Sequence, residues 1–373
     1  MWMSSRVFKT CSYLVYMICD NLCMTAEQIR GQMCKLKPFK APGPDCIPNV
    51  VLTKCADLLA EGLMHIYKAI LECRLSYKPW KTFTMVVLHK PGRPKYDIPK
   101  AYRPIALLNT MWKVLTVIMA DQLTYVTEKH RLLPDNHFRG RPGCTTMDAM
   151  HLIVEIVKSS WRAGKVTVVL FLDIEGAFPN MVPLRLEHNL LKCGIPRKIV
   201  TFVHNMLQDR ITTLKFDGYM SDPLQVDNSI GQGDPLSMIL YQYYNADLLD
   251  IPKSKEESAT AFVDDATMIA SADSFPKAHE MLVNMMTRPG GVAEWSTLHN
   301  SPLEYSKLAL VDFAHSCSPK ERVPLQLPQK EITPSASTKY LGVIFDQNLN
   351  WKAQQVYVAG KGTAWTSQIK QLT

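Results

Sequence analysis

No stretch of this 373-residue chain is apolar for long enough to cross a membrane. The best candidate, residues 13–19, falls far short of the roughly 20 residues that a spanning helix needs. Asp20 follows it, where a signal peptide would have small residues. The ten cysteines include no C-x-x-C pair, which excludes a zinc knuckle and a small disulfide framework. The glycine fingerprints of Rossmann and P-loop nucleotide sites are also absent. These absences predict an intracellular, non-secreted protein with reduced cysteines and no membrane partner.

Charged residues are scarce, at 20% of the chain, whereas 47% of residues are hydrophobic. This composition predicts a folded protein with two or three subdomains that share a sizeable core. Lysine and arginine number 42 against 34 acidic residues, a net charge of +8. Residues 35–141 hold 18 basic and 8 acidic side chains, so this segment alone carries +10. It indicates either a surface that faces a polyanion or an ordinary lysine-rich solvated surface.

Strand-like and helix-like patterns alternate without an internal repeat. Short β-branched or apolar runs predict strands at 82–89, 166–172, 211–216, 224–226 and 308–313, and hairpins at 259–270 and 340–345. Helical spacing predicts helices at 51–71, 106–126, 145–161, 182–191, 197–207, 235–249 and 275–295. Hairpins mixed with helices favour an α+β fold over a doubly wound sheet.

Acidic residues stand at the ends of two apolar strands. Asp173 directly follows VTVVLFL, and Asp264 and Asp265 lie in the turn of the hairpin at 259–270. A single carboxylate there is usually a turn or cap residue, but adjacent carboxylates repel each other unless a cation offsets them. Oxygen ligands of this kind suit Mg²⁺. If the two strands are neighbours, Asp173 and Asp264 meet at one edge and predict a two-metal site for in-line phosphoryl transfer.

Seven sequence blocks run through the chain: KAPGPDCIPN at 40–49, AYRPIALL at 101–108, HFRGRPGCTT at 137–146, LDIEGAF at 172–178, GQGDPLS at 231–237, AFVDD at 261–265 and KYLGV at 339–343. Together they resemble the reverse transcriptase of non-LTR (LINE-type) retrotransposons, and they are most similar to the fungal members. Each block alone is a weak signal. Seven blocks in the family's order, over about residues 35–352, make the resemblance specific.

The resemblance implies a right-hand polymerase fold of the α+β class. It divides the chain into an N-terminal extension (1–34), fingers (35–165), a palm with an antiparallel sheet (166–315), and a primer-grip hairpin with the start of a thumb (316–373). The implied activity is that of an RNA-directed DNA polymerase, which extends the 3′-hydroxyl of a DNA or RNA primer with dNTPs on an RNA template. The implied cofactor is a pair of Mg²⁺ ions, for which Mn²⁺ can substitute.

The same blocks imply the site residues. The implied metal ligands are Asp173, Asp264, Asp265 and the backbone carbonyl of Ile174. Lys307 resembles the lysine that protonates departing pyrophosphate. The implied nucleotide contacts are Lys90, Arg103, Phe178, Gln232 and Gly233. The implied nucleic-acid contacts are Arg139, Arg141, Tyr340 and Gly342. An aromatic ring at Phe178 leaves room for hydrogen but not for hydroxyl at C2′, which favours deoxynucleotides.

Several alternatives stay open. The 34 residues before the fingers are too few for the endonuclease of full-length LINE-type proteins, and the thumb is short. We therefore expect a retroelement fragment, found in a nuclear or cytoplasmic ribonucleoprotein, whose endonuclease acts in trans. One alternative is a catalytically inactive remnant that binds nucleic acid. An RNA-dependent RNA polymerase, against which Phe178 argues, is a second, and a group II intron maturase is a third. The roles of residues 1–34 and of Asp234 are not predicted.

Overall fold

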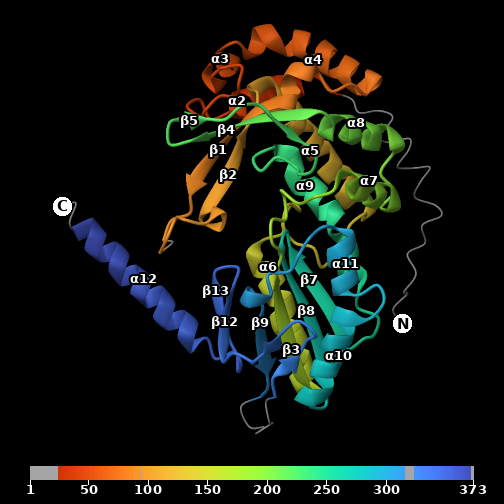
Figure 1. Cartoon of the computed structure of the whole chain (residues 1–373), viewed down its shortest axis with the longest axis vertical. Coiled ribbons are helices and arrows are strands. Elements are labelled where there is room, and N and C mark those ends of the chain that lie inside the picture. Colours follow the sequence, from red (N-terminus) through yellow and green to blue (C-terminus); the bar gives the residue numbers. More distant parts are fainter. Residues whose placement is uncertain (1–23, 93, 316–322, 371–373) are drawn as a thin grey trace. The chain divides into compact units, whose positions relative to one another are not determined.

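The computed structural model describes residues 24–92, 94–315 and 323–370. The chain folds into two compact units, each built from two separate stretches of sequence. The first unit contains the residues up to 133 together with 176–244, and the second contains 134–175 together with the residues from 245 onward. The apolar run at 13–19 and most of the predicted extension 1–34 lie outside the described residues. Figure 1 labels the elements of both units.

Helices from both stretches of sequence build the first unit. They are α2 (Ala26–Lys35), α3 (Asn49–Lys54), α4 (Ala56–Cys73), α5 (Thr110–His130), α7 (Pro183–Lys192), α8 (Arg197–Leu207) and α9 (Pro235–Tyr244). α5 packs against α9, and α7 packs against both α8 and α9. The two stretches therefore share one helical core.

A five-stranded sheet belongs to the same unit. Its strands are β1 (Thr82–His89), β2 (Tyr102–Leu107), β4 (Arg210–Phe216), β5 (Tyr219–Met220) and β6 (Leu224–Val226), and the 3-10 turns η1 (Lys78–Lys81) and η2 (Pro99–Ala101) precede β1 and β2. β1 lies between β2, which is antiparallel to it, and β4, which is parallel to it. β5 and β6 both pair with β4. The parallel pairing of β1 with β4 joins the two stretches of sequence, and Thr212 donates a hydrogen bond across it to the carbonyl of Phe83.

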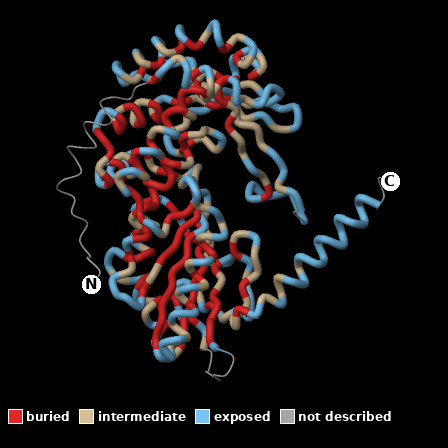
Figure 2. Tube along the Cα trace, turned by 180° about the vertical axis from the view of Figure 1, so that it is seen from behind, coloured by how far each residue is buried: buried red, intermediate tan, exposed pale blue. Residues whose placement is uncertain are grey.

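A four-stranded antiparallel sheet of order β7-β8-β3-β9 organises the second unit. Its strands are β3 (Val166–Asp173), β7 (Glu257–Phe262), β8 (Asp265–Ala272) and β9 (Ala309–Phe313). The central strands β3 and β8 are buried along nearly their whole length, as Figure 2 shows. Burial on both faces of the sheet explains why the sequence of β3 is continuously apolar rather than alternating.

Helices cover both faces of this sheet. α6 (Thr146–Arg162) places Ile153 in one buried cluster with Phe171 of β3 and Phe313 of β9. α10 (Phe275–Thr287) lies on the other face, where His279 is hydrogen-bonded to Asp312, the neighbour of Phe313 on β9, at 3.0 Å. Side chains of adjacent strand residues point to opposite faces, so the two helices sandwich the sheet.

Smaller elements complete the second unit. They are η3 (Ala246–Asp250), α11 (Val292–Leu298), η4 (Tyr305–Lys307), β10 (Leu325–Gln326), β11 (Glu331–Ile332), β12 (Ser337–Tyr340), β13 (Val343–Asp346) and α12 (Lys352–Lys370). β10 pairs with β11 and β12 with β13, whereas α12 buries none of its residues. Within the described residues, no helix combines the length and the apolar character that crossing a membrane requires.

Most predicted elements are confirmed, and the predicted strand at 82–89 is β1 residue for residue. Some helix predictions were wrong in their extent. The helix expected from residue 106 begins at Thr110, because residues 102–107 pair with β1 as β2. The helix expected at 51–71 is interrupted at Cys55, and the one expected at 235–249 is interrupted at Asn245. The helix expected at 275–295 breaks after Thr287, before a glycine pair whose first member, Gly290, has φ +72°.

Gly43, in the block at 40–49, lies against the backbone where α5 begins. A Cβ atom at this position would stand 2.5 Å from the carbonyl carbon of Leu108 and 2.6 Å from the amide nitrogen of Asn109. Backbone atoms cannot rotate out of the way, so we expect Gly43→Ala to destabilise the protein by about 1–3 kcal/mol. Thermal unfolding would report this as a lower melting temperature.

Gly62→Ala is the matched control for Gly43→Ala. Gly62 lies inside α4, and apart from the two neighbouring residues and the adjacent backbone of its own helix, no described atom comes within 4 Å of the Cβ position. Alanine is the better helix former, so this substitution should stabilise the protein by up to about 1 kcal/mol. A melting temperature for Gly43→Ala equal to or above that of wild type would contradict the close contact.

Candidate active site

The sheet of the second unit brings two of the predicted carboxylates face to face. Asp173 is the last residue of β3, Asp265 is the first residue of β8, and their Cα atoms are direct partners in the antiparallel register. Residues so placed have Cβ atoms about 4.5–5.5 Å apart, and like charges directly opposite each other destabilise a sheet. The arrangement therefore calls for a cation.

Asp264 occupies the tight loop between β7 and β8. Phe262 and Asp265 pair with each other, which leaves only Val263 and Asp264 to reverse the chain. Val263 has φ +66°, a left-handed conformation that is a genuine outlier for a β-branched residue. Strain of this kind costs about 1–3 kcal/mol and persists only where the surrounding structure holds it. All three predicted aspartates thus lie at the same end of two neighbouring strands.

The carboxylates of this hairpin are electrostatically disfavoured. Loss of hydration and, next, the charge of Asp173 raise the pKa of Asp264. Loss of hydration, followed by the charges of Asp264 and Asp173, raises the pKa of Asp265 to about 6. The guanidinium of Arg139, 5.3 Å from the ring centre of Phe262, opposes both shifts. The pKa values of Asp264 and Asp265 stay raised despite this guanidinium, so a bound divalent ion would relieve the repulsion between the carboxylates.

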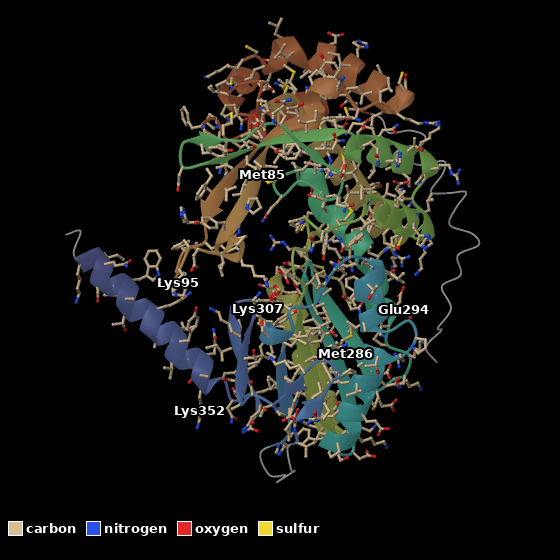
Figure 3. The ribbon with its side chains drawn as sticks, in the orientation of Figure 1. Met85, Lys95, Met286, Glu294, Lys307 and Lys352 are labelled. Carbon is tan, nitrogen blue, oxygen red and sulfur yellow. The ribbon has the colours of Figure 1, made fainter. Side chains whose placement is uncertain are left out.

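Lys307 lies at the same strand end, as Figure 3 shows by its label. Its ammonium group donates to Oδ2 of Asp173 at 2.6 Å, and the two side chains are 54% and 39% exposed. The 3-10 turn that carries it is fixed by its neighbour Glu304, whose backbone NH donates to the carbonyl of Asp173. The lysine predicted as a proton donor therefore contacts a predicted metal ligand directly.

The described residues contain no group of three or more His, Cys, Asp or Glu side chains that could hold a metal ion by itself. The three aspartates consequently do not form a closed protein cage. Mg²⁺ needs no such cage, because it is usually bound by one or two carboxylates together with substrate phosphates and water. Solvent-accessible carboxylates at Asp264 and Asp265 fit that donor set. Ile174 forms an antiparallel bridge with Leu303 and is 6% exposed, so ligation through its carbonyl stays a prediction.

The hairpin β12–β13 reaches the same end of the sheet. Its turn consists of Leu341 and Gly342, with φ values of +48° and +90°, the pair of positive angles that a type I′ turn requires. The ring of Tyr340 lies 5.1 Å from that of Phe171 on β3 and is almost fully buried. Burial and, less strongly, the charge of Asp265 raise the pKa of Tyr340. Tyr340 therefore anchors the hairpin, and contact with nucleic acid stays a prediction for Tyr340 and Gly342.

The two arginines of the block at 137–146 differ in their surroundings. Arg139 is exposed and lies over Phe262, next to the acidic loop. The side chain of Arg141 is only 13% exposed, donates to the carbonyl of Pro134 at 3.2 Å and pairs with Asp135 at 3.7 Å. Arg141 thus stabilises its own loop, and contact with nucleic acid stays a prediction for both residues.

In the first unit, Phe178 stacks on a tyrosine of α9. Its ring centre lies 5.0 Å from that of Tyr241 at an interplanar angle of 20°, and Tyr241 is fully buried. The carbonyl of Phe178 accepts a hydrogen bond from the amide of Ile230, just before the block at 231–237. The predicted steric gate and the predicted nucleotide-binding loop are therefore neighbours. Sequence analysis did not single out Tyr241, although three tyrosines within residues 241–244 of a predicted helix signal an aromatic wall.

The loop at 231–233 lies on the backbone of β2. The carbonyl of Gln232 accepts from the amide of Ala106 at 2.9 Å, and a Cβ atom on Gly233 would come within 3.0 Å of the carbonyl oxygen of Ala106. Gly233 also has φ +122°, which other residues rarely adopt. Arg103, an exposed residue of the same strand, belongs to this neighbourhood by its place on β2.

Asp234, whose role the sequence left open, caps α9. It accepts hydrogen bonds from the amide of Leu236 at 2.9 Å and from the indole of Trp112 on α5 at 3.0 Å. Burial is the largest influence and raises its pKa, while these bonds and the charge of Arg210 oppose the shift. Asp234 therefore links two packed helices and is a structural residue of the first unit.

Lys90 is held within the connection between β1 and β2. Its backbone amide donates to Ala101 at 2.8 Å, and its ammonium group donates to the carbonyl of Lys100 at 3.0 Å. The phenol of Tyr96 donates to the carbonyl of Lys90, and that of Tyr102 donates to the carbonyl of Tyr96. These bonds tie Lys90 to Tyr96 and Tyr96 to Tyr102, whose rings are also in contact, and a role in binding triphosphate stays a prediction for Lys90 and Arg103.

Comparison with known proteins gives a consistent assignment. The model of the reverse transcriptase (RNA-dependent DNA polymerase) family matches residues 88–345. A probable RNA-directed DNA polymerase from transposon X-element of Drosophila melanogaster is 26% identical over 84% of this chain and 34% of its own length. The RNA-directed DNA polymerase from mobile element jockey of the same organism is 24% identical over 88% of this chain and 36% of its own length. The chain spans about a third of the length of the curated relatives it matches.

Among solved structures, apo telomerase from Candida tropicalis aligns with 73% of this chain and 55% of that chain, at 10% identity and a TM-score of 0.49. The family match covers well over half of this chain and includes both strand ends that carry the aspartates. Members of this family have the right-hand polymerase fold and generally use divalent metal ions. The chain therefore belongs to the reverse transcriptase (RNA-dependent DNA polymerase) family.

Proposed function

We propose that this chain is an RNA-directed DNA polymerase, which extends the 3′-hydroxyl of a DNA or RNA primer with dNTPs on an RNA template. The observation that carries the proposal is the pairing of Asp173 with Asp265, with Asp264 in the adjoining loop, in a member of the reverse transcriptase family. Accelerating phosphoryl transfer depends mainly on positioning and on neutralising charge, and exposed carboxylates at a rigid sheet end are suited to both.

In the proposed site, Asp173, Asp264, Asp265 and the carbonyl of Ile174 hold two Mg²⁺ ions, with Mn²⁺ as a substitute. When bound, these ions lower the pKa of the primer 3′-hydroxyl and neutralise the leaving pyrophosphate. The rigidity of β3 and β8, which are buried up to the acidic residues, supports this role because it fixes the carboxylates before substrate arrives.

The other residues of the proposed site bind substrate or move a proton. Lys307, which donates to Asp173 here, releases that carboxylate and protonates pyrophosphate through the same ammonium group. Lys90 and Arg103 contact the triphosphate, the arginine with a bidentate geometry that lysine lacks. Gln232 and Gly233 contact the nucleotide through a loop whose backbone lies close to β2. An RNA-dependent RNA polymerase is disfavoured by the aromatic ring of Phe178, which leaves no room for a 2′-hydroxyl.

Nucleic acid is contacted, in this proposal, by Arg139, Arg141 and the β12–β13 hairpin with Tyr340 and Gly342. Binding through phosphates releases counterions, so affinity for a primer–template should fall with added salt. In a plot of the logarithm of the binding constant against the logarithm of salt concentration, each phosphate neutralised contributes about −0.9 to the slope. We expect Arg139→Gln to reduce that slope by about one unit, measured by fluorescence anisotropy between low and high salt.

Arg162→Gln serves as the matched control for Arg139→Gln. Arg162 is an exposed arginine of the same unit and pairs with Glu155 on α6. Its removal should leave the salt dependence of binding unchanged. Equal slopes for wild type and Arg139→Gln would contradict a phosphate contact at Arg139.

The test of the proposed function is primer extension with dNTPs on an RNA template, with Mg²⁺ present and absent. Extension that requires Mg²⁺ supports the polymerase, whereas binding without extension supports the alternative of an inactive remnant. The expected likeness to fungal members, an endonuclease acting in trans and a location in an intracellular ribonucleoprotein stay predictions that belong to this proposal.

A further inference from the structure

The conformation of Val263 poses a question that the proposed chemistry does not answer. A β-branched residue with φ +66° does not stay in that conformation by its own preference, yet Asp264 can occupy its place only if Val263 does. Some contact must therefore hold the loop. We look for it among the hydrogen bonds that the backbone of Val263 makes.

The side-chain amide of Asn245 donates to the carbonyl of Val263 at 2.5 Å. A carbonyl oxygen only accepts, so the Nδ2 group of Asn245 faces Val263 and its Oδ1 faces the other way, toward Nε2 of His137 at 3.0 Å. Oδ1 accepts in turn, which makes Nε2 of His137 the protonated nitrogen. Asn245 and His137 are both fully buried, so neither bond competes with water.

His137 is kept in the form that this bond needs. Burial lowers its pKa to about 4, so the ring is neutral at physiological pH. Its other nitrogen, Nδ1, has no hydrogen-bond partner among the described residues, and the ring therefore directs its one side-chain bond to Asn245. A neutral donor of fixed tautomer suffices here, and a positive charge is not required.

The backbone of His137 is itself tied to β7. It forms a parallel bridge with Ala261, the amide of Phe138 donates to the carbonyl of Ala261 at 3.0 Å, and the amide of Ala261 donates to the carbonyl of Asn136 at 3.1 Å. His137 thus rests on the strand that leads into the loop and reaches, through Asn245, the loop itself. Val263 is therefore linked to His137 in two ways, through the side chain of Asn245 and through the backbone pairing with Ala261.

We propose that His137 and Asn245 are positioning residues: their buried hydrogen bonds hold Val263 in its left-handed conformation and so place the carboxylate of Asp264 at the end of the sheet. This inference rests on the proposed polymerase function for its effect on rate, but its effect on the loop is independent of activity. His137 belongs to the block at 137–146, in which the sequence suggested roles only for the two arginines.

The test compares two substitutions at His137. His137→Leu removes the donor, whereas His137→Gln keeps a neutral N–H group near the position of Nε2. We expect His137→Leu to lower kcat for primer extension by roughly 10- to 100-fold, with the KM for dNTP within about twofold of wild type, as for other residues that orient a catalytic group. His137→Gln should restore most of the lost kcat. A buried histidine that matters only for general packing would not separate kcat from KM in this way.

A second substitution addresses the backbone directly. Glycine adopts positive φ without strain, so adding Val263→Gly to His137→Leu should recover part of the lost kcat. Hydrogen exchange of the peptide spanning residues 257–272, measured without nucleic acid or metal, should be faster in His137→Leu than in wild type and normal in His137→Gln. A peptide from α10 provides the internal reference, because its exchange should not change.

These measurements separate the two proposals. If wild type extends no primer, the polymerase proposal fails, and the exchange comparison still decides whether His137 holds the loop. If His137→Leu does not fold, Asn245→Asp keeps the side-chain size while removing the Nδ2 donor, and it should show the same faster exchange. Unchanged exchange in the 257–272 peptide, a wild-type kcat in His137→Leu, or equal losses in the Leu and Gln variants would each overturn the positioning role.

Discussion

Replacing Asp264 by asparagine should lower Mg²⁺-dependent primer extension by at least about 100-fold while template binding stays nearly intact. Replacing a residue that only orients a metal ligand lowers metal affinity or activity by roughly 10- to 100-fold. Replacing a charged ligand itself should lower activity by more than that. Asparagine preserves the size of the side chain and the tight loop that it occupies, but it contributes no negative charge toward a divalent cation. Extension rates on an RNA template and anisotropy of a labelled primer–template give the two readouts.

The stability of this variant carries separate information. Loss of hydration and the charge of Asp173 both raise the pKa of Asp264, which means that the folded protein disfavours its ionised form. Replacing that group by a neutral one removes the unfavourable interaction, so the melting temperature of Asp264→Asn should equal or exceed that of wild type. A residue that lowers stability while activity depends on it is the expected signature of a functional site.

Asp273→Asn is the matched control for Asp264→Asn. Asp273 directly follows β8, at the end of the strand away from Asp265, and it forms an exposed ion pair with Lys277 at 3.6 Å. Exposed pairs of this kind contribute little, so both activity and melting temperature should stay at wild-type values. Full extension by Asp264→Asn, or a comparable loss in Asp273→Asn, would remove the assignment of the acidic loop to catalysis.

The secondary structure could be predicted from sequence because local patterns determine it. The apolar run ending at Asp173 became β3, and the acidic hairpin became β7 and β8. Helix interruptions were harder to predict. Cys55 carries no breaker signal, since it is neither proline, glycine nor asparagine, and the structure gives no contact among the described residues that explains its break. Asparagine is a weak helix-stop signal, and Asn245 interrupts its helix where its side chain bonds to Val263 and His137.

Local sequence patterns did not predict which segments pack together in each of the two units. Residues 176–244 pack with the residues before 134, and residues 134–165 pack with the antiparallel sheet, whereas the predicted fingers and palm follow one another along the chain. The parallel pairing of β1 with β4 produces the first grouping. Which strand pairs with which depends on the complementarity of whole surfaces, and nothing in TFTMVVLH specifies a partner.

The sequence predicted which acidic residues lie close together, but it did not predict which of them face each other in the sheet. The strands at 166–173 and 259–264 were expected to be neighbours and to bring Asp173 to Asp264, but β8 lies between β7 and β3 in the sheet, so Asp173 lies opposite Asp265 and Asp264 stays in the loop. The apolar patterns of the two hairpin strands do not specify which of them pairs with β3. Asp234 shows the opposite case: an acid before a helix is a local capping signal, and the structure uses it in that way.

If the chain acts as the proposed polymerase, replacing Phe178 by alanine should allow it to incorporate ribonucleotides. The ring of Phe178 stacks on that of buried Tyr241, with the ring centres 5.0 Å apart, and this contact favours its present orientation. A methylene-sized difference in a pocket changes discrimination by roughly 10- to 200-fold, and we expect the ratio of kcat/KM for dNTP over rNTP to fall by a factor of that order. Single-nucleotide incorporation on an RNA template, with dNTP and rNTP measured separately, gives this ratio.

Phe39→Ala tests whether removal of any aromatic ring would have the same effect. Phe39 belongs to the same unit and is 93% exposed, so its loss should change neither stability nor sugar selection. In Phe178→Ala the change should lie in the rNTP kinetics, since removing the ring adds space at C2′ without adding a contact to the deoxynucleotide. Sugar discrimination unchanged from wild type would show that Phe178 is a packing partner of Tyr241 and not a gate, and it would reopen the question of which sugar the enzyme uses.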